Sequence, residues 1–512
     1  MGLAFWFTIL PLIAALLILV LPKLSSGVYR TLALAGGILS LILVLVGWFA
    51  FDGAASSVQL AGRIPWFTLP GLWHGHNLAV GLSFGVDGLS LPLATMTAVI
   101  GVLSLLAVPR DRQRARENYF WLSLALTGLL GVFTSQDLFT FLVALELVLF
   151  AVFFLVYLYG DPGHKEAAVK FLIYRGFSTV AFMVALVGLA WAAAGGYATA
   201  NANAGNAVFT FNIPALTATL HQAISQWLSP AAASALFLVL LLGVFIEEAF
   251  VPFHTWLPTT HEHADPSTNM LIGGVVTKTG AYVLLRFGVG MLPGEVRHWG
   301  VLLAVFGVIN ILYGAFAAWS SKDWRRLIAY SGISHMGLVL LGVAALNTAG
   351  LQGAMFMLIS SGLLTALLFF LTGAMKDRTT TLTIRSLGGL SKSMPVLSGF
   401  LLVAALGSLG LPLTSGFISE IQAFIGGFAT YPAISFVGAL GVVLSAVYLL
   451  YAMERTTFGP TAEGFLKLAD ARPFEYVPAV VLTGLVLLVG IYPDVIGHLF
   501  GLSAQALLRI GG

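Results

Sequence analysis

The sequence predicts an all-α polytopic membrane protein of about 14 transmembrane helices, with two inverted five-helix repeats that each contain a Pro-broken helix. The first supporting observation is composition: only 9% of the 512 residues are charged and 59% are hydrophobic, whereas about a quarter of an ordinary chain is charged. The others are recurrent long apolar stretches and basic residues that gather in alternate loops. This pattern excludes a cytosolic enzyme, a nucleic-acid-binding protein and a disordered scaffold.

A bilayer core about 30 Å thick requires about 20 apolar residues for each helical crossing. On this scale the predicted spans begin near Leu3, Arg30, Leu82, Tyr119, Leu138, Ala167, Ala232, Met270, Gly300, Leu327, Leu351, Val396, Tyr431 and Val477. The first stretch has no charged segment before it and no small-residue cleavage site, so we interpret it as a retained helix. The single membrane domain then divides into N-terminal helices (1–118), a first repeat (119–290), a second repeat (300–456) and a C-terminal helix (477–512).

Basic residues predict how the chain is oriented. Seventeen Lys and Arg residues fall in loops that follow odd-numbered spans, and the opposite side has three, namely Arg63, Arg297 and Arg509. Because cytoplasmic loops are enriched in Lys and Arg, both termini are expected to face away from the cytoplasm, in a bacterial-type inner membrane. The net charge of +3 therefore reflects topology and indicates no anionic partner.

Two predicted spans are interrupted by proline close to acidic residues. In the seventh span Pro252 follows Glu247 and Glu248, and in the twelfth Pro412 precedes Glu420. Proline removes a helical hydrogen bond, and non-helical backbone at membrane depth is tolerated where it is buried in protein or lines a water-filled cavity. The breaks lie five spans apart, and since five is odd the two halves are expected to be inverted, as in many secondary transporters.

Acidic residues inside the spans are candidate functional residues, because a charge at a helix centre costs roughly 2.5 kcal/mol or more unless it is paired or hydrated. Glu146, Glu247, Glu248 and Glu420 are all surrounded by apolar sequence. Such a carboxyl group suits proton exchange; the alternative is a protonated Glu that only links helices by hydrogen bonds. The adjacent Glu247 and Glu248 diverge by about 100° on a helix, so we expect one to carry the proton and the other to orient or cap the break.

Basic residues and one histidine inside the spans complete the set of candidates. Lys278 lies about 12 Å along its helix from Met270, near the middle of the bilayer, so we expect it to carry protons. Lys170 and Arg286 are nearer to span ends and are expected to snorkel. His335 in the tenth span is either part of the relay or a satisfied core residue.

No cofactor or metal site is predicted in this chain. The segment HTWLPTTHEH at 254–263 contains three histidines, but it lacks the HExxH spacing, and we expect a capped loop at a cavity mouth. Zero Cys excludes iron–sulfur clusters and disulfides, so any redox chemistry must take place in another polypeptide. No nucleotide-binding or hydrolase motif stands in a fitting context.

Several motifs resemble the antiporter-like subunits of respiratory complex I, the proton-translocating NADH–quinone oxidoreductase, and among them subunit M, also called chain 4. The resemblance runs from about residue 87 to 455, and its most specific parts are VDGLSL at 86–91, GVFTSQDLFTFLVALEL at 131–147, PFHTWLP at 252–258, TKTGAYVLLRF at 277–287, KDWRRLIAYSGISHMG at 322–337 and LGLPLTSGFISE at 409–420. It implies that Glu146, Lys278, His335 and Glu420 form a central hydrophilic axis along which protons move. It also implies other membrane subunits as partners, with quinone reached only through them.

Two positions depart from the family pattern. The family has a Lys, paired with the fifth-span Glu, at the place of Glu247, and often a His at the place of Ser361. Clustered carboxylates do not all ionise without a cation, because like charges oppose one another. We therefore expect the guanidinium of Arg175, about 12 Å into the sixth span, to approach Glu146, Glu247 or Glu248 directly or through one water. The switching proton would then sit on a carboxyl group, since Arg stays protonated.

Two other interpretations follow from the same residues. The D-type subunits of sodium/proton antiporter complexes and related subunits of membrane-bound hydrogenases share the core motifs, so a cation/proton antiporter subunit or a membrane-bound hydrogenase subunit is one alternative. A structural membrane scaffold is the other, and it predicts that apolar residues can replace the buried charges without loss of transport. In each case the expected surroundings are other membrane subunits, water, protons and lipid.

Overall fold

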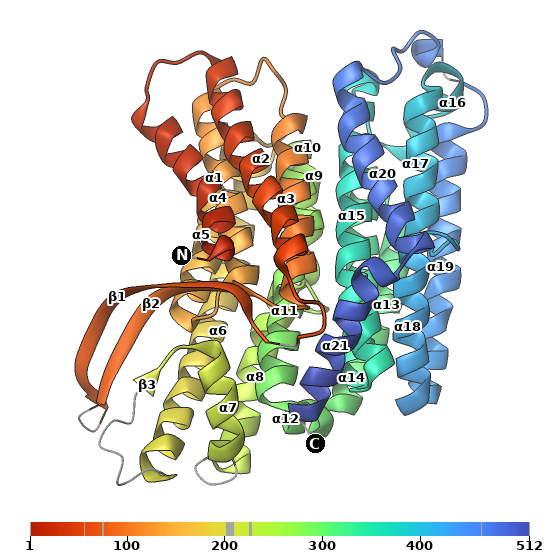
Figure 1. Cartoon of the computed structure of the whole chain (residues 1–512). Coiled ribbons are helices and arrows are strands. Elements are labelled where there is room, and N and C mark those ends of the chain that lie inside the picture. Colours follow the sequence, from red (N-terminus) through yellow and green to blue (C-terminus); the bar gives the residue numbers. More distant parts are fainter. Residues whose placement is uncertain are drawn as a thin grey trace.

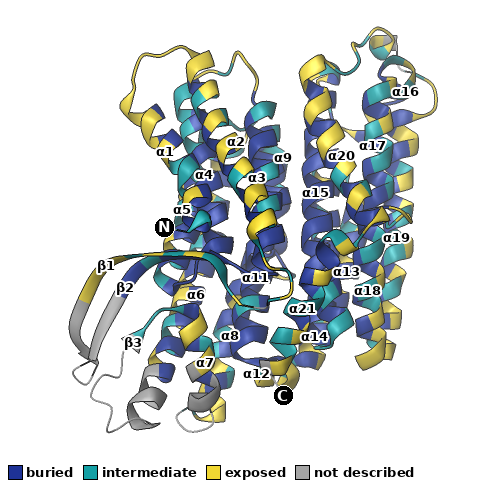
Figure 2. Cartoon of the chain, viewed as in Figure 1, coloured by how far each residue is buried: buried dark blue, intermediate teal, exposed yellow. Residues whose placement is uncertain are grey.

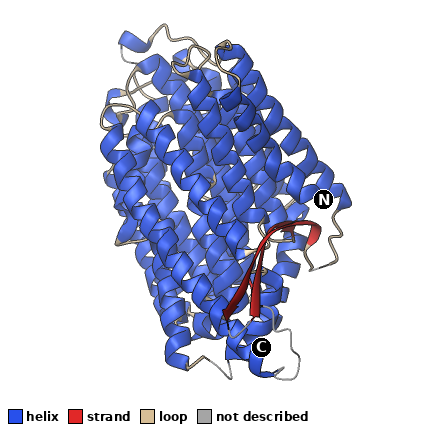
Figure 3. Ribbon diagram, turned by 90° about the vertical axis from the view of Figure 1, so that its left-hand side faces the viewer, coloured by secondary structure: helices blue, strands red, loops and turns tan. Residues whose placement is uncertain are grey.

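The computed structural model describes residues 2–55, 57–73, 76–200, 209–224, 228–461 and 463–510. Helices run side by side through most of the molecule, and a small sheet lies at one end (Figures 1 and 3). Twelve helices in these ranges are long and apolar enough to cross a membrane, which confirms a predominantly helical, polytopic membrane protein. Two of the predicted spans fall outside this set: α4, which begins with charged and polar residues, and the interrupted pair α17 and α18.

In the described residues of the first part of the chain, the helices are α1 (Leu3–Val20), α2 (Ser26–Ala50), α3 (Ser90–Ala107), α4 (Ala115–Thr134), α5 (Leu138–Tyr159), α6 (His164–Ala200), α7 (Ile213–Ile224), α8 (Pro230–Glu247), α9 (Trp256–His263), α10 (Pro266–Gly274), α11 (Thr279–Val283) and α12 (Pro293–His298). The rest holds α13 (Gly300–Ser320), α14 (Trp324–Ala344), α15 (Thr348–Thr379), α16 (Leu390–Ser393), α17 (Pro395–Ser408), α18 (Ser415–Thr430), α19 (Pro432–Thr457), α20 (Tyr476–Ile491) and α21 (Asp494–Ile510). The strands are β1 (Gln59–Trp73), β2 (His76–Val86) and β3 (Phe209–Thr210).

The third span begins later than the sequence predicts. Leu82 lies in β2, where it faces Ile64 of β1 in an antiparallel register, and β3 joins the other edge of β2 in parallel. The helix α3 starts only at Ser90, because the Asp87 carboxylate accepts the Ser90 amide at 2.9 Å and caps its first turn. The run of apolar residues before Asp87 therefore belongs to a hairpin and not to a helix.

Helices are interrupted in the structure near Pro252 and near Pro412. The helix α8 ends at Glu247, and α9 begins only at Trp256, after a turn and a 3₁₀ segment, Phe253–Thr255. The helix α17 ends at Ser408 and α18 begins at Ser415. In this second break Gly410 has φ +78°, a left-handed conformation that Gly adopts without strain.

A third break lies in the eighth span, which the sequence predicts as continuous. The helix α10 ends at Gly274, a 3₁₀ turn covers Val276–Lys278, and α11 passes into a π-helical segment, Leu284–Val289. No proline marks this break. The C-terminal region also differs from prediction: the single helix expected from 477 onward is divided into α20 and α21 before Pro493, because a residue that precedes proline is disfavoured in the helical conformation.

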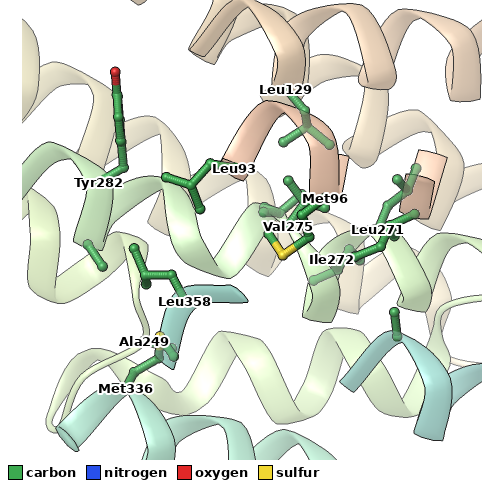
Figure 4. Close-up of a cluster of buried hydrophobic side chains, with 14 of the residues drawn as sticks. Leu93, Met96, Leu129, Ala249, Leu271, Ile272, Val275, Tyr282, Met336 and Leu358 are labelled. Atoms are coloured by element: carbon green, nitrogen blue, oxygen red, sulfur yellow. The ribbon is translucent and has the colours of Figure 1, made fainter. Parts of the chain in front are cut away.

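The core of the molecule lies around α15 and the third break. The helix α15 packs against α3, α10, α14, α17, α18 and α20, and its apolar residues are buried along the membrane-spanning part (Figure 2). Leu93 and Met96 of α3 lie beside Ile272 and Val275 at the end of α10 (Figure 4). This apolar packing keeps lipid away from the broken backbone, so protein groups and water must satisfy its polar atoms.

Ion pairs join segments at the end of the molecule that carries the basic loops. Arg378 of α15 donates to both carboxylate oxygens of Glu475, at 3.1 and 2.6 Å. Asp161 contacts both Arg325 and Lys376, so the loop after α5 is fastened to the second half of the chain. Burial alone would raise the pKa of Asp161, but these two cations outweigh it and lower the pKa, which keeps the carboxylate ionised.

We expect Glu475→Gln to destabilise the protein, because it leaves the guanidinium of Arg378 buried without its counter-ion. The two side chains are only 3% and 4% exposed, and breaking such a pair costs about 3 kcal/mol. Thermal unfolding of the purified protein in detergent measures the effect. The matched control is Glu262→Gln, whose partner Arg326 is 45% exposed. An equal change in both variants would contradict the structural role of the Arg378–Glu475 pair.

Candidate functional site

Charged side chains meet where α8 ends against the break between α10 and α11. The helix α6 contributes Arg175 from the side, and α8 contributes Glu247 and Glu248 at its last turn. The helices α8 and α11 are in contact, as are α6 and α8 (Figure 1). Residues more than 100 positions apart in the sequence, such as Arg175 and Val276, thereby come within hydrogen-bond range.

Arg175 forms an ion pair with Glu247. Its Nη2 lies 2.5 Å from Glu247 Oε1, and both side chains are 2% exposed. Of the three glutamates named as candidate partners, Glu247 is the one that Arg175 contacts. The guanidinium also lies over the rings of Phe171 and Trp256, with Cζ 5.7 and 5.9 Å from their centroids, and Nη1 is 3.4 Å from the Val276 carbonyl. The cation is thus enclosed by protein and faces neither lipid nor headgroups.

The broken backbone of the eighth span supplies donors to both carboxylates. The first amides of a helix have no partner within it, and the amide of Ala281 in the first turn of α11 donates to Glu248 Oε1 at 2.6 Å. The Thr279 hydroxyl lies 2.7 Å from Glu247 Oε1 as a donor. A Cβ atom on Gly280 would lie 2.9 Å from Glu247 Cβ and 3.0 Å from Glu248 Cγ. Only glycine therefore permits α11 to approach the end of α8 this closely.

Lys278 lies within the break and is fully surrounded by protein. Its Nζ donates to the Gly273 carbonyl at 2.9 Å and to Thr277 Oγ1 at 3.0 Å. In the described ranges of the chain, no carboxylate lies within the 4.0 Å of an ion pair with this ammonium group. The carboxylate that acts on it electrostatically is that of Glu248.

Beside the second break, Glu420 of α18 faces His335 of the continuous helix α14. His335 Nδ1 lies 3.8 Å from Glu420 Oε1, too far for a direct hydrogen bond but within reach of a small side-chain movement. The Glu420 carboxylate packs against Gly410, where an added Cβ would lie 2.5 Å from Oε2. The second break, with Gly410, and the third break, with Gly280, therefore each place a glycine against a buried glutamate side chain.

A cavity of about 10 Å³ adjoins His335, between α14, α15, α17 and α18. This is about the space that one water molecule needs. Six polar residues line it: Ser331, His335, Ser360, Ser361, Thr365 and Ser408. The Ser361 hydroxyl is buried and has no hydrogen-bond partner in the described part of the protein, so a water molecule in the cavity would satisfy it.

Glu146 stands apart from these contacts. It is half-buried on α5 and forms no ion pair with any described residue. Its carboxylate still acts on the Arg175 guanidinium, after those of Glu247 and Glu248. The fifth-span acid thus belongs to the electrostatic surroundings of Arg175, and the direct contact is made by Glu247.

The two basic residues that were expected to snorkel, Lys170 and Arg286, both have protein partners. Arg286 Nη1 lies 2.5 Å from Asp87 Oδ2, and its Nε donates to the Tyr282 hydroxyl at 3.1 Å. Snorkelling was therefore a wrong expectation for Arg286, and the acidic residue in VDGLSL was the available signal. Lys170 Nζ donates to the carbonyl of Thr255 at 2.8 Å, beside the break in the seventh span.

The histidines near the seventh span form hydrogen bonds. His254 Nε2 and the Tyr313 hydroxyl are 2.9 Å apart, and His261 Nδ1 lies 2.7 Å from Asn269 Oδ1. The Asn269 amide group also donates to the carbonyls of His261 and Ala264, which closes the loop before α10. Among the residues that the structure describes, no three His, Asp or Glu side chains are grouped as a metal site would require.

Comparison with known proteins relates this architecture to one family. The chain is 34% identical to NAD(P)H-quinone oxidoreductase chain 4 2 of Thermosynechococcus vestitus, over 98% of this chain and 91% of that protein. A chain of respiratory complex I from Thermus thermophilus with bound NADH superposes with a TM-score of 0.83 at 28% identity, covering 99% of this chain and 100% of that one. A chain of the Mrp complex from Dietzia sp. gives a TM-score of 0.81 at 19% identity over 100% and 99%, which shows a shared fold. Residues 135–447 match the family described as NADH:quinone oxidoreductase/Mrp antiporter, TM. With its three broken helices and their buried charges, the chain belongs to this transmembrane family of NADH:quinone oxidoreductase and Mrp antiporter subunits.

Proposed function

We propose that the chain is the proton-translocating, antiporter-like membrane subunit of a complex I-type NADH–quinone oxidoreductase. The observation that carries the proposal is the row of buried ionisable groups beside the helix breaks, from Arg175 of α6 and Glu247 through Lys278 to His335 of α14 and Glu420. Such groups are too costly in a membrane to serve as mere packing. The relative named chain 4 and the complex I neighbour, both aligned over nearly the whole chain, support the assignment.

The proposed path has two ends and a hydrated middle. Glu146 and the Arg175–Glu247 pair lie at one end, and Glu420 with His335 lies at the other. Lys278 stands between them, and the cavity beside His335 and Ser361 has room for a water molecule that bridges distances too long for direct transfer. A proton entering near Glu146 would pass through Glu248 and Lys278 and leave through His335 and Glu420.

We further infer the predicted arrangement of 14 spans in two inverted repeats, 119–290 and 300–456. In this arrangement α4 and the α17–α18 pair are the two additional crossings. A buried acid packed against a glycine recurs in both halves, as Glu247 and Glu248 against Gly280 and as Glu420 against Gly410, which supports the repeat. Discontinuous helices typically form the ion sites of transporters built from such repeats.

Redox chemistry belongs to other subunits in this proposal. The chain has no Cys for an iron–sulfur cluster, and its buried charges are placed for proton movement. We therefore propose other membrane subunits as partners, with quinone reached only through them, and protons, water and lipid as the direct surroundings. Co-purification separates this setting from a cation/proton antiporter: iron–sulfur and quinone-site subunits indicate the first, and small antiporter subunits indicate the second.

Replacement of the two central proton carriers is expected to stop pumping while the complex still assembles. Glu420→Gln removes the acid at one end of the path, and Lys278→Met removes the cation in the middle; each change keeps the side-chain size. The measurement is proton movement per electron by the complex in sealed vesicles. Glu262→Gln, at an exposed ion pair, controls for the loss of one negative charge. Wild-type pumping by Glu420→Gln would refute the proposed path.

The proposed orientation predicts opposite accessibility of two exposed positions. The chain has no Cys, so single cysteines can be introduced without background. Ser57, the site of the first cysteine, lies in the exposed segment between α2 and β1, and Lys392, the site of the second, lies in α16 at the top of Figure 1. In intact spheroplasts a membrane-impermeant maleimide should label Ser57→Cys, and it should label Lys392→Cys only after permeabilisation. The reverse pattern would show that the termini face the cytoplasm.

A further inference from the structure

The two adjacent glutamates at the end of α8 have different surroundings. Glu247 Oε1 is held by the Arg175 guanidinium at 2.5 Å and by the Thr279 hydroxyl at 2.7 Å. Glu248 has no ion pair in the described ranges; its Oε1 accepts one backbone amide, and its Oε2 is buried without any hydrogen-bond partner there. The first carboxylate therefore has a cation in direct contact, and the second is held by one backbone amide alone.

Arg175 fixes the charge of Glu247. A guanidinium does not release its proton under ordinary conditions, and this one is enclosed by the rings of Phe171 and Trp256. Protonation of Glu247 would leave that cation buried and unpaired, which is strongly unfavourable. Glu247 is thus suited to hold Arg175 in place and is poorly suited to gain and lose a proton during turnover.

Glu248 and Lys278 complement each other. An ammonium group has three donors, and two of those on Lys278 are used, by the Gly273 carbonyl and Thr277 Oγ1. The charges of Lys278 and Glu248 act on each other, whereas no carboxylate in the described part of the chain forms an ion pair with Lys278. In the described part of the chain, Glu248 Oε2 accepts no hydrogen bond, and one of the three N–H donors that a charged Lys278 has is unused. A proton exchanged between the two side chains would therefore move between groups that have no other partner at those positions.

We propose that Glu248 is the proton-carrying carboxyl group of the first half of the path, that Lys278 is its exchange partner, and that Glu247 is the fixed counter-ion of Arg175. In the exchange the O–H bond of the Glu248 carboxylic acid breaks as an N–H bond forms on neutral Lys278 Nζ, giving a carboxylate and an ammonium group. Lys278 then releases the proton toward the cavity beside His335. This assignment rests on the proposed function. It gives Glu248 the proton-carrying role of the Lys that the family has at the preceding position, 247.

Infrared spectroscopy of the assembled complex, combined with pumping measurements in vesicles, tests the assignment. A protonated carboxyl group has a C=O stretching band that a carboxylate lacks. Glu248→Gln should remove such a band and slow proton transfer through this subunit by about 100-fold, the usual effect of losing an acid–base group. Glu247→Gln should leave the band in place, because Glu247 is ionised. Glu262→Gln, at an exposed ion pair, should change neither measurement.

The assignment would be overturned if the carboxylic acid C=O band were lost in Glu247→Gln and kept in Glu248→Gln. Normal pumping by Glu248→Gln would also overturn it, as would an unchanged C=O band in Glu248→Asp. The last variant keeps a carboxyl group, and its band should shift in frequency even if Glu248→Gln fails to assemble. Glu420→Gln separates this inference from the proposed function. If Glu420→Gln stops pumping while Glu248→Gln pumps normally, only the assignment of Glu248 fails; if both pump normally, the proton path itself fails.

Discussion

The cost of placing charge inside a membrane is the constraint on which this structure depends. Arg175 and Glu247 offset this cost by forming an ion pair at 2.5 Å, in which both side chains are almost fully buried. Their contact joins α6 to the last turn of α8 and holds the end of the broken seventh span in place. Because one guanidinium neutralises one carboxylate, the neighbouring Glu248 is left without a cation in direct contact within the described residues. A paired carboxylate and a carboxylate without an ion pair in the described residues thus stand side by side.

Broken helices supply the second half of the design. A continuous helix satisfies its own amides and carbonyls, whereas a helix that restarts inside the membrane offers free amides to a carboxylate and free carbonyls to a cation. Ala281 uses such an amide on Glu248, and the Gly273 carbonyl accepts from Lys278. Glycine allows the close approach in each half, at Gly280 and Gly410. Buried charged side chains are therefore held by backbone groups that a regular membrane helix does not expose.

Much of this arrangement could be predicted from the sequence, and the failures have physical causes. Proline marked the breaks at Pro252 and Pro412, and the depth of Arg175 in its span required an acidic partner. The break that contains Lys278 is not marked by a proline. It is stabilised by contacts with the end of α8, which is distant in the sequence. The pairing of Arg286 with Asp87 joins residues 199 positions apart, and the apolar strand before Asp87 has the composition of a membrane helix. Periodicity and composition do not report such long-range contacts.

The central claim is that Lys278 and Glu420 belong to one hydrated path, and the positions of ordered water test it most directly. A structure of the complete complex in lipid, at a resolution that resolves water, should contain molecules in the cavity beside His335 and Ser361. We expect these waters to connect Lys278 Nζ with the Glu420 carboxylate through His335. Dry apolar packing along the whole distance between Lys278 and Glu420 would contradict this account.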